Sequence, residues 1–345
     1  MMLEFIILVL IISLILYAVF AGADFGAGIY EFLCLVQRRS SRKELVEKAI
    51  GPIWESNHIW LILVIVIFFM GFPVPFSTFS NIFHIPLVFV IIGIIFRGTA
   101  FAFRQYDPVE DKWQNIYTWI FALSSVWTAF WQGVIIGSLF SSLPKEMMSF
   151  GQYFINPWFT LFSFSTGIFV CATYLFLAQT FFLSESPTDI NVRNAIRIDI
   201  WKSLIFVFFS GLLVFIVAYF TNPDFIDAFF TNPYSIIFAG ITTLLLIPLI
   251  WSFRTKYFRL SRLIVAIQVA FIFMAVLVKR FPILIYYQDH TTLSFNEAAA
   301  PPAVITQLFW ALLVGVIIII PFLVYLLKIF KSEKGIRKEI NKSPL

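Results

Sequence analysis

Nine apolar runs, each long enough to cross a lipid bilayer, constrain this chain more than any other feature of its sequence. They lie at roughly residues 3–30, 50–70, 82–104, 114–140, 157–183, 200–220, 234–253, 260–279 and 304–328. A membrane helix needs about 20 mostly apolar residues, whereas a barrel strand needs about ten with alternating polarity. The runs therefore predict an all-α polytopic membrane protein, one integral-membrane domain over residues 1–345. Nine transmembrane helices fit two four-helix bundles plus one peripheral helix, which is the arrangement that we expect.

The overall composition supports this class. Hydrophobic residues make up 60% of the chain and charged residues 12%, whereas soluble domains carry about 45–50% and 25%. The net charge of +5 does not indicate a nucleic-acid partner, because the basic residues lie between the apolar runs.

The first run is long for one crossing. We expect its helix to project beyond the lipid or to bend near Gly22, Gly26 and Gly28. No Lys or Arg precedes this run and Glu4 is acidic, whereas a secretory signal begins with a basic region. The run is therefore expected to remain as the first span.

The distribution of basic residues predicts the orientation of the chain. Most Lys and Arg side chains fall in alternate connections, at 37–49, 97–113, 184–202 and 253–263, and in the tail from 328. The other connections carry only Lys145, Lys279 and Arg280. Cytoplasmic loops carry the excess of positive charge, so the N-terminus is expected outside and the C-terminus in the cytoplasm. This orientation requires an odd number of spans, which agrees with nine.

The second run begins with an unusually polar stretch, residues 51–61. It contains a carboxylate, an amide, an imidazole and two indoles: Glu55, Asn57, His58, Trp54 and Trp60. A carboxylate within lipid costs roughly 2.5–3.5 kcal/mol on insertion scales, so it is rare without a partner or a function. This stretch is the first candidate for a functional site.

Asp24 and Glu55 are predicted to lie at a similar depth near the cytoplasm. Asp24 lies about 30 Å along the first helix, at about 1.5 Å per residue, and Glu55 lies shortly after the second helix leaves the cytoplasm. Burial and a neighbouring carboxylate both raise the pKa of a carboxyl group, which suits a proton path. Alternatively, Asp24 caps a helix break and Glu55 pairs with Arg97 or Arg104.

The histidines do not indicate a metal or haem site. Glu55-x-x-His58 is half of a di-iron motif, which needs two such pairs, and the chain has no second Glu-x-x-His. His84 and His290 are far away in the sequence and fall at the outer side. We therefore expect this chain to bind no metal or haem, and the role of His58 stays open.

Three motifs together resemble subunit II of the cytochrome bd-type quinol oxidases. They are Trp54-Glu55-x-Asn57-x-x-Trp60 after Gly51-Pro52, the segment Ala23-Asp24-Phe25-Gly26-Ala27-Gly28, and the pair Phe96-Arg97 with Phe103-Arg104. The resemblance implies a heterodimer in a prokaryotic cell membrane that oxidises membrane quinol and reduces dioxygen to water. The haems b and d would belong to the larger subunit I.

The resemblance also implies roles for single residues. Glu55 and Asp24 correspond to acids of a proton path from the cytoplasm, and Trp60 corresponds to a residue that lines a proposed gas route. The depth of Trp60 in the membrane, without the resemblance, predicts that its side chain is a packing wall. The sequence leaves open which quinol is used, whether a structural quinone or lipid binds, and whether a small single-span subunit joins.

A proton-coupled secondary transporter is the alternative function. Nine spans with a few buried charges suit that class, which keeps polar groups near the midplane on broken helices. Here the polar residues gather toward the cytoplasm, which favours the oxidase subunit.

Overall fold

The computed structural model describes residues 1–38, 43–106, 112–147, 149–184, 190–255 and 257–340, without the side chains of 43–56, 105–106, 112, 184, 279, 320 and 323–340. Its long helices are α1 (Met2–Val36), α2 (Lys43–Gly71), α4 (His84–Tyr106), α5 (Lys112–Ser138), α7 (Leu161–Ser184), α8 (Ile190–Thr221), α12 (Phe258–Arg280) and α13 (Pro302–Ile340). The shorter helices α10 (Pro233–Leu244) and α11 (Leu246–Thr255) follow each other closely.

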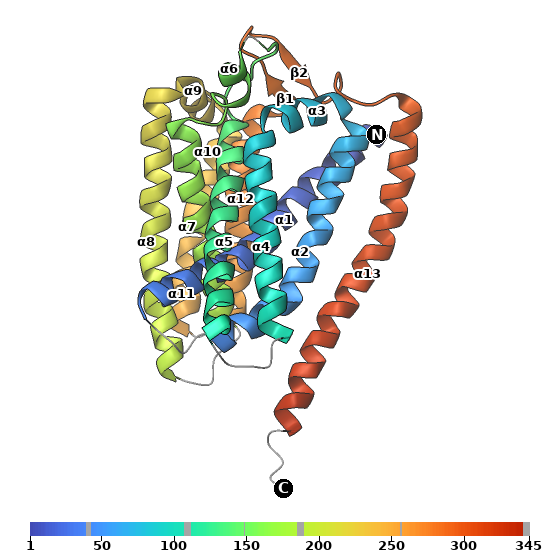
Figure 1. Cartoon of the computed structure of the whole chain (residues 1–345). Coiled ribbons are helices and arrows are strands. Elements are labelled where there is room, and N and C mark those ends of the chain that lie inside the picture. The colour runs from blue at the N-terminus through green and yellow to red at the C-terminus, as the bar shows by residue number, and fades with distance from the viewer. Residues whose placement is uncertain (39–42, 107–111, 148, 185–189, 256, 341–345) are drawn as a thin grey trace.

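The structure confirms an all-α polytopic membrane protein. Among the described residues, eight helical segments are long and apolar enough to cross a membrane, or nine if a bent pair is counted as one span. Helices satisfy their own backbone polar groups, which lipid requires. Figure 1 shows the start of α1 and the end of α13 at opposite ends of the molecule. The grouping into two four-helix bundles stays a prediction.

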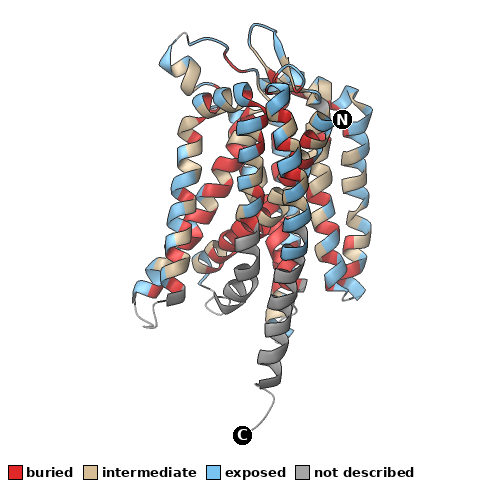
Figure 2. Cartoon of the chain, turned by 90° about the vertical axis from the view of Figure 1, so that its right-hand side faces the viewer, coloured by how far each residue is buried: buried red, intermediate tan, exposed pale blue. Residues whose placement is uncertain are grey.

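Helix α1 is the centre of the fold. It is continuous from Met2 to Val36, and Figure 1 shows it crossing the bundle obliquely. It packs against α2, α5, α7 and α12, and every residue from Ala21 to Glu31 is buried. Figure 2 shows buried residues on the inward sides of the helices and exposed ones on the outside. Because alanine and glycine dominate this segment, neighbouring helices can approach it closely on every side.

Gly26 marks the closest approach, and Gly26→Ala should destabilise the protein by about 1–3 kcal/mol. An added Cβ would overlap the carbonyl oxygen of Tyr174 on α7 and lie 2.9 Å from the Cβ of Ala178. The backbones of α1 and α7 would have to separate. Gly240→Ala is the matched control, because nothing lies within 4 Å of its added Cβ and alanine favours a helix. Thermal unfolding that leaves Gly26→Ala as stable as Gly240→Ala would contradict this packing.

Three of the shorter helices begin at a proline. α3 (Pro73–Ile82) follows α2 at an angle of 117°, and α9 (Pro223–Thr231) and α10 also start at a proline. Proline suits the first helical position because no hydrogen-bond partner is required there. The side chains of Asn222 and Asn232 cap α9 and α10 by accepting from backbone N–H groups.

A small cap covers the end of the bundle that carries the N-terminus (Figure 1). It contains the antiparallel strands β1 (Ile283–Tyr286) and β2 (Thr292–Ser294) and the short helix α6 (Phe150–Phe154). The backbone N–H of Leu143 donates to the carbonyl oxygen of Tyr286 in β1, and the Leu143 carbonyl oxygen accepts from the backbone N–H of Gln288. Lys145 forms an exposed ion pair with Asp289 at 3.0 Å. The cap therefore ties the connection after α5 to the long connection after α12.

Candidate functional site

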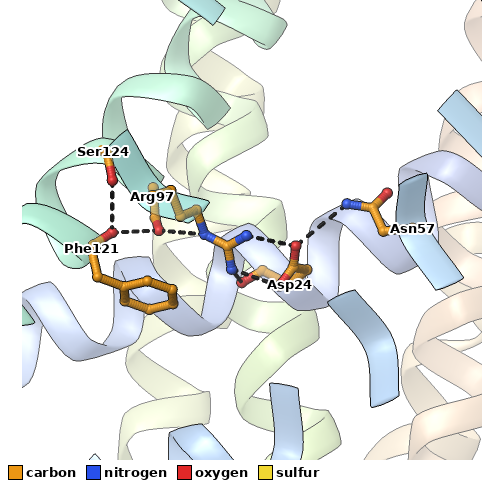
Figure 3. A network of polar contacts seen from close by, with 6 residues as sticks. Asp24, Asn57, Arg97, Phe121 and Ser124 are labelled. Atoms are coloured by element: carbon orange, nitrogen blue, oxygen red, sulfur yellow. Dashed lines mark hydrogen bonds and ion pairs between the residues drawn. The ribbon is translucent and has the colours of Figure 1, made fainter. Parts of the chain in front are cut away.

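A fully buried ion pair joins α1 to α4. The Asp24 carboxylate accepts from Arg97 at both oxygens, with Nη2–Oδ1 at 2.5 Å and Nη1–Oδ2 at 2.7 Å. The side chains are 0% and 3% exposed. Arg97 also donates from Nη2 to the Asp24 carbonyl oxygen and from Nε to the Ser125 hydroxyl. Figure 3 shows the guanidinium held between α1 and α5.

The Asp24 carboxylate is surrounded by hydrogen-bond donors from two helices. A bidentate arginine–carboxylate pair has strong, charge-assisted hydrogen bonds. Asn57 of α2 adds a weaker donor, with its Nδ2 3.4 Å from Asp24 Oδ2. The carboxylate thus accepts three side-chain hydrogen bonds, two from Arg97 and one from Asn57. Asp24 is a buried, paired carboxylate rather than an exposed acid.

A cavity of about 330 Å³ opens beside this pair. It lies between α1, α2 and α4, and its polar lining comes from Tyr17, Asp24, Asn57, His58, Arg97 and Thr99. Asn57 is only 3% exposed, and among the described residues its Oδ1 has no hydrogen-bond partner. The site therefore combines a fixed charge pair with room for polar molecules.

A second buried ion pair repeats the first one seven residues further along both helices. Arg104 Nη1 lies 2.8 Å from Glu31 Oε1. The guanidinium groups of Arg97 and Arg104 lie 4.8 Å and 4.7 Å from the centroid of the Phe121 ring on α5. Cations favour such positions near an aromatic face, so α5 helps to hold both arginines in place.

The structure places the predicted site residues as follows. Asp24 and Arg97 meet directly, and Arg104 pairs with Glu31. Glu55 lies on α2, but its side chain is outside the described residues, so the expected pairing of Glu55 with an arginine is also outside them. Asp24 caps no helix break, because α1 continues to Val36.

His58 and Trp60 both lie on α2. His58 is half-buried and lines the cavity. Trp60 is 8% exposed, and within the described part of the chain its indole nitrogen has no hydrogen-bond partner. Where the structure gives side chains, no cluster of three or more His, Cys, Asp or Glu residues could hold a metal ion.

Sequence reasoning missed Glu31 as a member of this site. The signal was available, because Asp24 and Glu31 have the same seven-residue spacing as Arg97 and Arg104. Residues seven apart lie on one face of a helix, so matched acids and bases at this spacing predict two ion pairs between two helices.

Comparisons with known proteins agree with this fold. A bd oxidase structure from Geobacillus thermodenitrificans superposes with a TM-score of 0.74 at 19% identity, covering 95% of this chain and 98% of that one. At this identity the likeness concerns the fold alone.

Sequence comparisons identify the family. Cytochrome bd ubiquinol oxidase subunit 2 of Bacillus subtilis (strain 168) is 29% identical over 150 residues, 43% of each chain. Cytochrome bd-I ubiquinol oxidase subunit 2 of Escherichia coli (strain K12) is 22% identical over 187 residues, 53% of this chain and 48% of that protein. The chain thus spans less than half the length of these relatives. The family model for cytochrome bd terminal oxidase subunit II matches residues 2–330, and the chain belongs to that family.

Proposed function

We propose that this chain is the haem-free subunit of a cytochrome bd-type oxidase, a complex that oxidises membrane quinol and reduces dioxygen to water. The observation that carries this proposal is the family match over residues 2–330. The larger subunit I would hold the haems and carry out the redox chemistry. The scarcity of histidine here, three residues in 345, supports that division, because an axial haem ligand is usually His, Met, Cys or Tyr.

The proposal includes a proton path from the cytoplasm through Glu55 and the cavity. Glu55 precedes His58 by three residues in α2, so its backbone position lies near the face that carries a cavity-lining residue. Asp24 contributes as one half of its buried pair with Arg97. In this scheme Glu55 exchanges the proton, and the Asp24–Arg97 pair makes the wall of the cavity polar enough for water.

In the same proposal, Trp60 forms an apolar wall beside the proton path. At that position its side chain would line a gas route. The expected orientation completes the scheme, with the N-terminus outside and the tail in the cytoplasm. Protons taken up for water formation would then come from the inner side of the cell membrane.

Purification of the chain from its native membrane should test this function. The chain should co-purify at a fixed ratio with a larger protein, and the complex should show haem absorption in the red. It should also oxidise quinol with uptake of oxygen. A colourless protein that moves a solute by itself in vesicles would contradict the proposal and support a proton-coupled transporter.

A further inference from the structure

A chain of polar side chains leads from the cavity into the core of the bundle. Gln132 of α5 donates from Nε2 to the hydroxyl oxygen of Tyr17 on α1, at 2.7 Å. The Oε1 of the same amide accepts from the hydroxyl of Tyr174 on α7, at 3.3 Å. Both Gln132 and Tyr174 are buried. The amide of Gln132 is therefore engaged at both ends, between two phenol hydroxyls.

This arrangement leaves the Tyr17 hydroxyl able to make a further hydrogen bond. A phenol has one O–H donor and can also accept. The Tyr17 oxygen accepts from Gln132, so its own hydrogen remains available. Within the described part of the chain, the hydrogen bonds of Tyr17 include no acceptor for it, and Tyr17 lines the cavity. Tyr17 can therefore donate to a molecule that binds in the cavity.

Asn57 presents the opposite polarity on the same cavity. Its Nδ2 donates to Asp24, which fixes the amide so that Oδ1 is the remaining acceptor. Asn57 is 3% exposed, and within the described residues Oδ1 has no donor. A buried acceptor without a donor is unfavourable, because it has lost its hydrogen bonds to water. A molecule that accepts from Tyr17 and donates toward Asn57 would satisfy both groups.

We propose that Tyr17 and Asn57 are positioning residues that hold a file of ordered water beside the Asp24–Arg97 pair, with Gln132 and Tyr174 orienting Tyr17. Water fits both requirements, since each molecule donates and accepts. A buried water needs two to four polar partners and about 30 Å³ of liquid volume, so a cavity of about 330 Å³ has room for several.

The two anchors also give the water file a direction. Tyr17 precedes Asp24 by seven residues on α1, or about 10 Å along the helix at 1.5 Å per residue. Asn57 follows Glu55 by two residues on α2. The file would therefore run from the level of Glu55, past the ion pair, to Tyr17. This inference rests on the proposed proton path and names the groups that order its water.

Tyr17→Phe in the whole complex tests the inference. It removes one hydroxyl without changing the shape of the ring. Turnover should fall about fivefold, the effect of one net hydrogen bond of about 1 kcal/mol. The loss should deepen as pH rises, and the solvent deuterium isotope effect should increase, because proton delivery becomes limiting. Haem absorption should not change.

Tyr30→Phe is the matched control. Tyr30 lies on the same helix, is fully buried and donates to Asp199 at 3.2 Å, but it does not line the cavity. It should leave turnover and the isotope effect unchanged. Equal kinetic losses in both variants would overturn the inference, because they would reflect a general loss of packing.

A high-resolution experimental map of the complex provides a second, independent readout. Ordered water should lie about 3 Å from Tyr17 Oη and from Asn57 Oδ1, and Tyr17→Phe should lose the first of these waters. A quinone ring, a lipid tail or a side chain of the partner subunit in that place would overturn the inference. If Glu55→Gln slows turnover but Tyr17→Phe does not, the proton path stands and this inference alone fails. Full turnover in Glu55→Gln overturns the path itself.

Discussion

Arg97→Met is expected to destabilise the protein by about 3–5 kcal/mol, the cost of removing one partner of a buried ion pair. The substitution keeps a long apolar stem but leaves the Asp24 carboxylate, which is 0% exposed, without its counter-charge. It also removes the donor to Ser125 and the cation beside Phe121. Thermal unfolding in detergent, followed by tryptophan fluorescence, measures the loss.

Lys145→Met is the control, because it removes an ion pair that is exposed rather than buried. Lys145 and Asp289 are 50% and 43% exposed, and exposed ion pairs contribute only about 0–1 kcal/mol. This variant should unfold close to the parent protein. The double variant Asp24→Leu with Arg97→Met should recover much of the stability lost by Arg97→Met alone, because no unpaired charge remains. If Arg97→Met is as stable as Lys145→Met, the ion pair does not hold α1 to α4.

Glu55→Gln is expected to reduce quinol oxidase turnover on the order of 10²-fold while the complex stays assembled, since positioned proton-transfer groups contribute 10²–10⁴-fold. Glutamine keeps the size and polarity of the side chain but cannot carry a proton. The effect should appear in turnover rather than in stability, which distinguishes it from that of Arg97→Met.

Two further variants sharpen the interpretation of Glu55→Gln. Glu55→Asp keeps an ionisable carboxyl group and should retain a large part of the activity. Glu4→Gln changes an exposed glutamate next to the N-terminus and should have no effect. Normal turnover of an intact Glu55→Gln complex would remove Glu55 from the proton path.

The sequence predicts the helical membrane class of this fold because length and hydropathy alone decide it. The run at 200–220 illustrates the limit, since α8 begins at Ile190, ten residues earlier. Its first turns are polar because they lie beyond the apolar stretch, so hydropathy does not detect them. The same limit hides α3, whose helical start depends on Pro73 rather than on apolar length.

Hydropathy marks some members of the candidate site but not their pairing. Asp24, Arg97 and Arg104 stand out as charges within or next to apolar runs, whereas Glu31 does not. Their partners depend on which helix faces meet, and hydropathy does not determine this. The pairing of Asp24 with Arg97 across 73 residues is indicated only by the matched seven-residue spacing of the two acids and the two arginines.

The two ion pairs between α1 and α4 have a consequence for the biogenesis of this protein. Each acid on α1 meets an arginine synthesised 73 residues later. During synthesis, α1 therefore reaches the membrane before its counter-charges exist, and an unpaired acid at depth costs roughly 2.5–3.5 kcal/mol. The final burial of α1 must wait for α4 and α5. Chains that stall before α4 would display two unneutralised acids, a mark by which membrane quality control could recognise unfinished subunits.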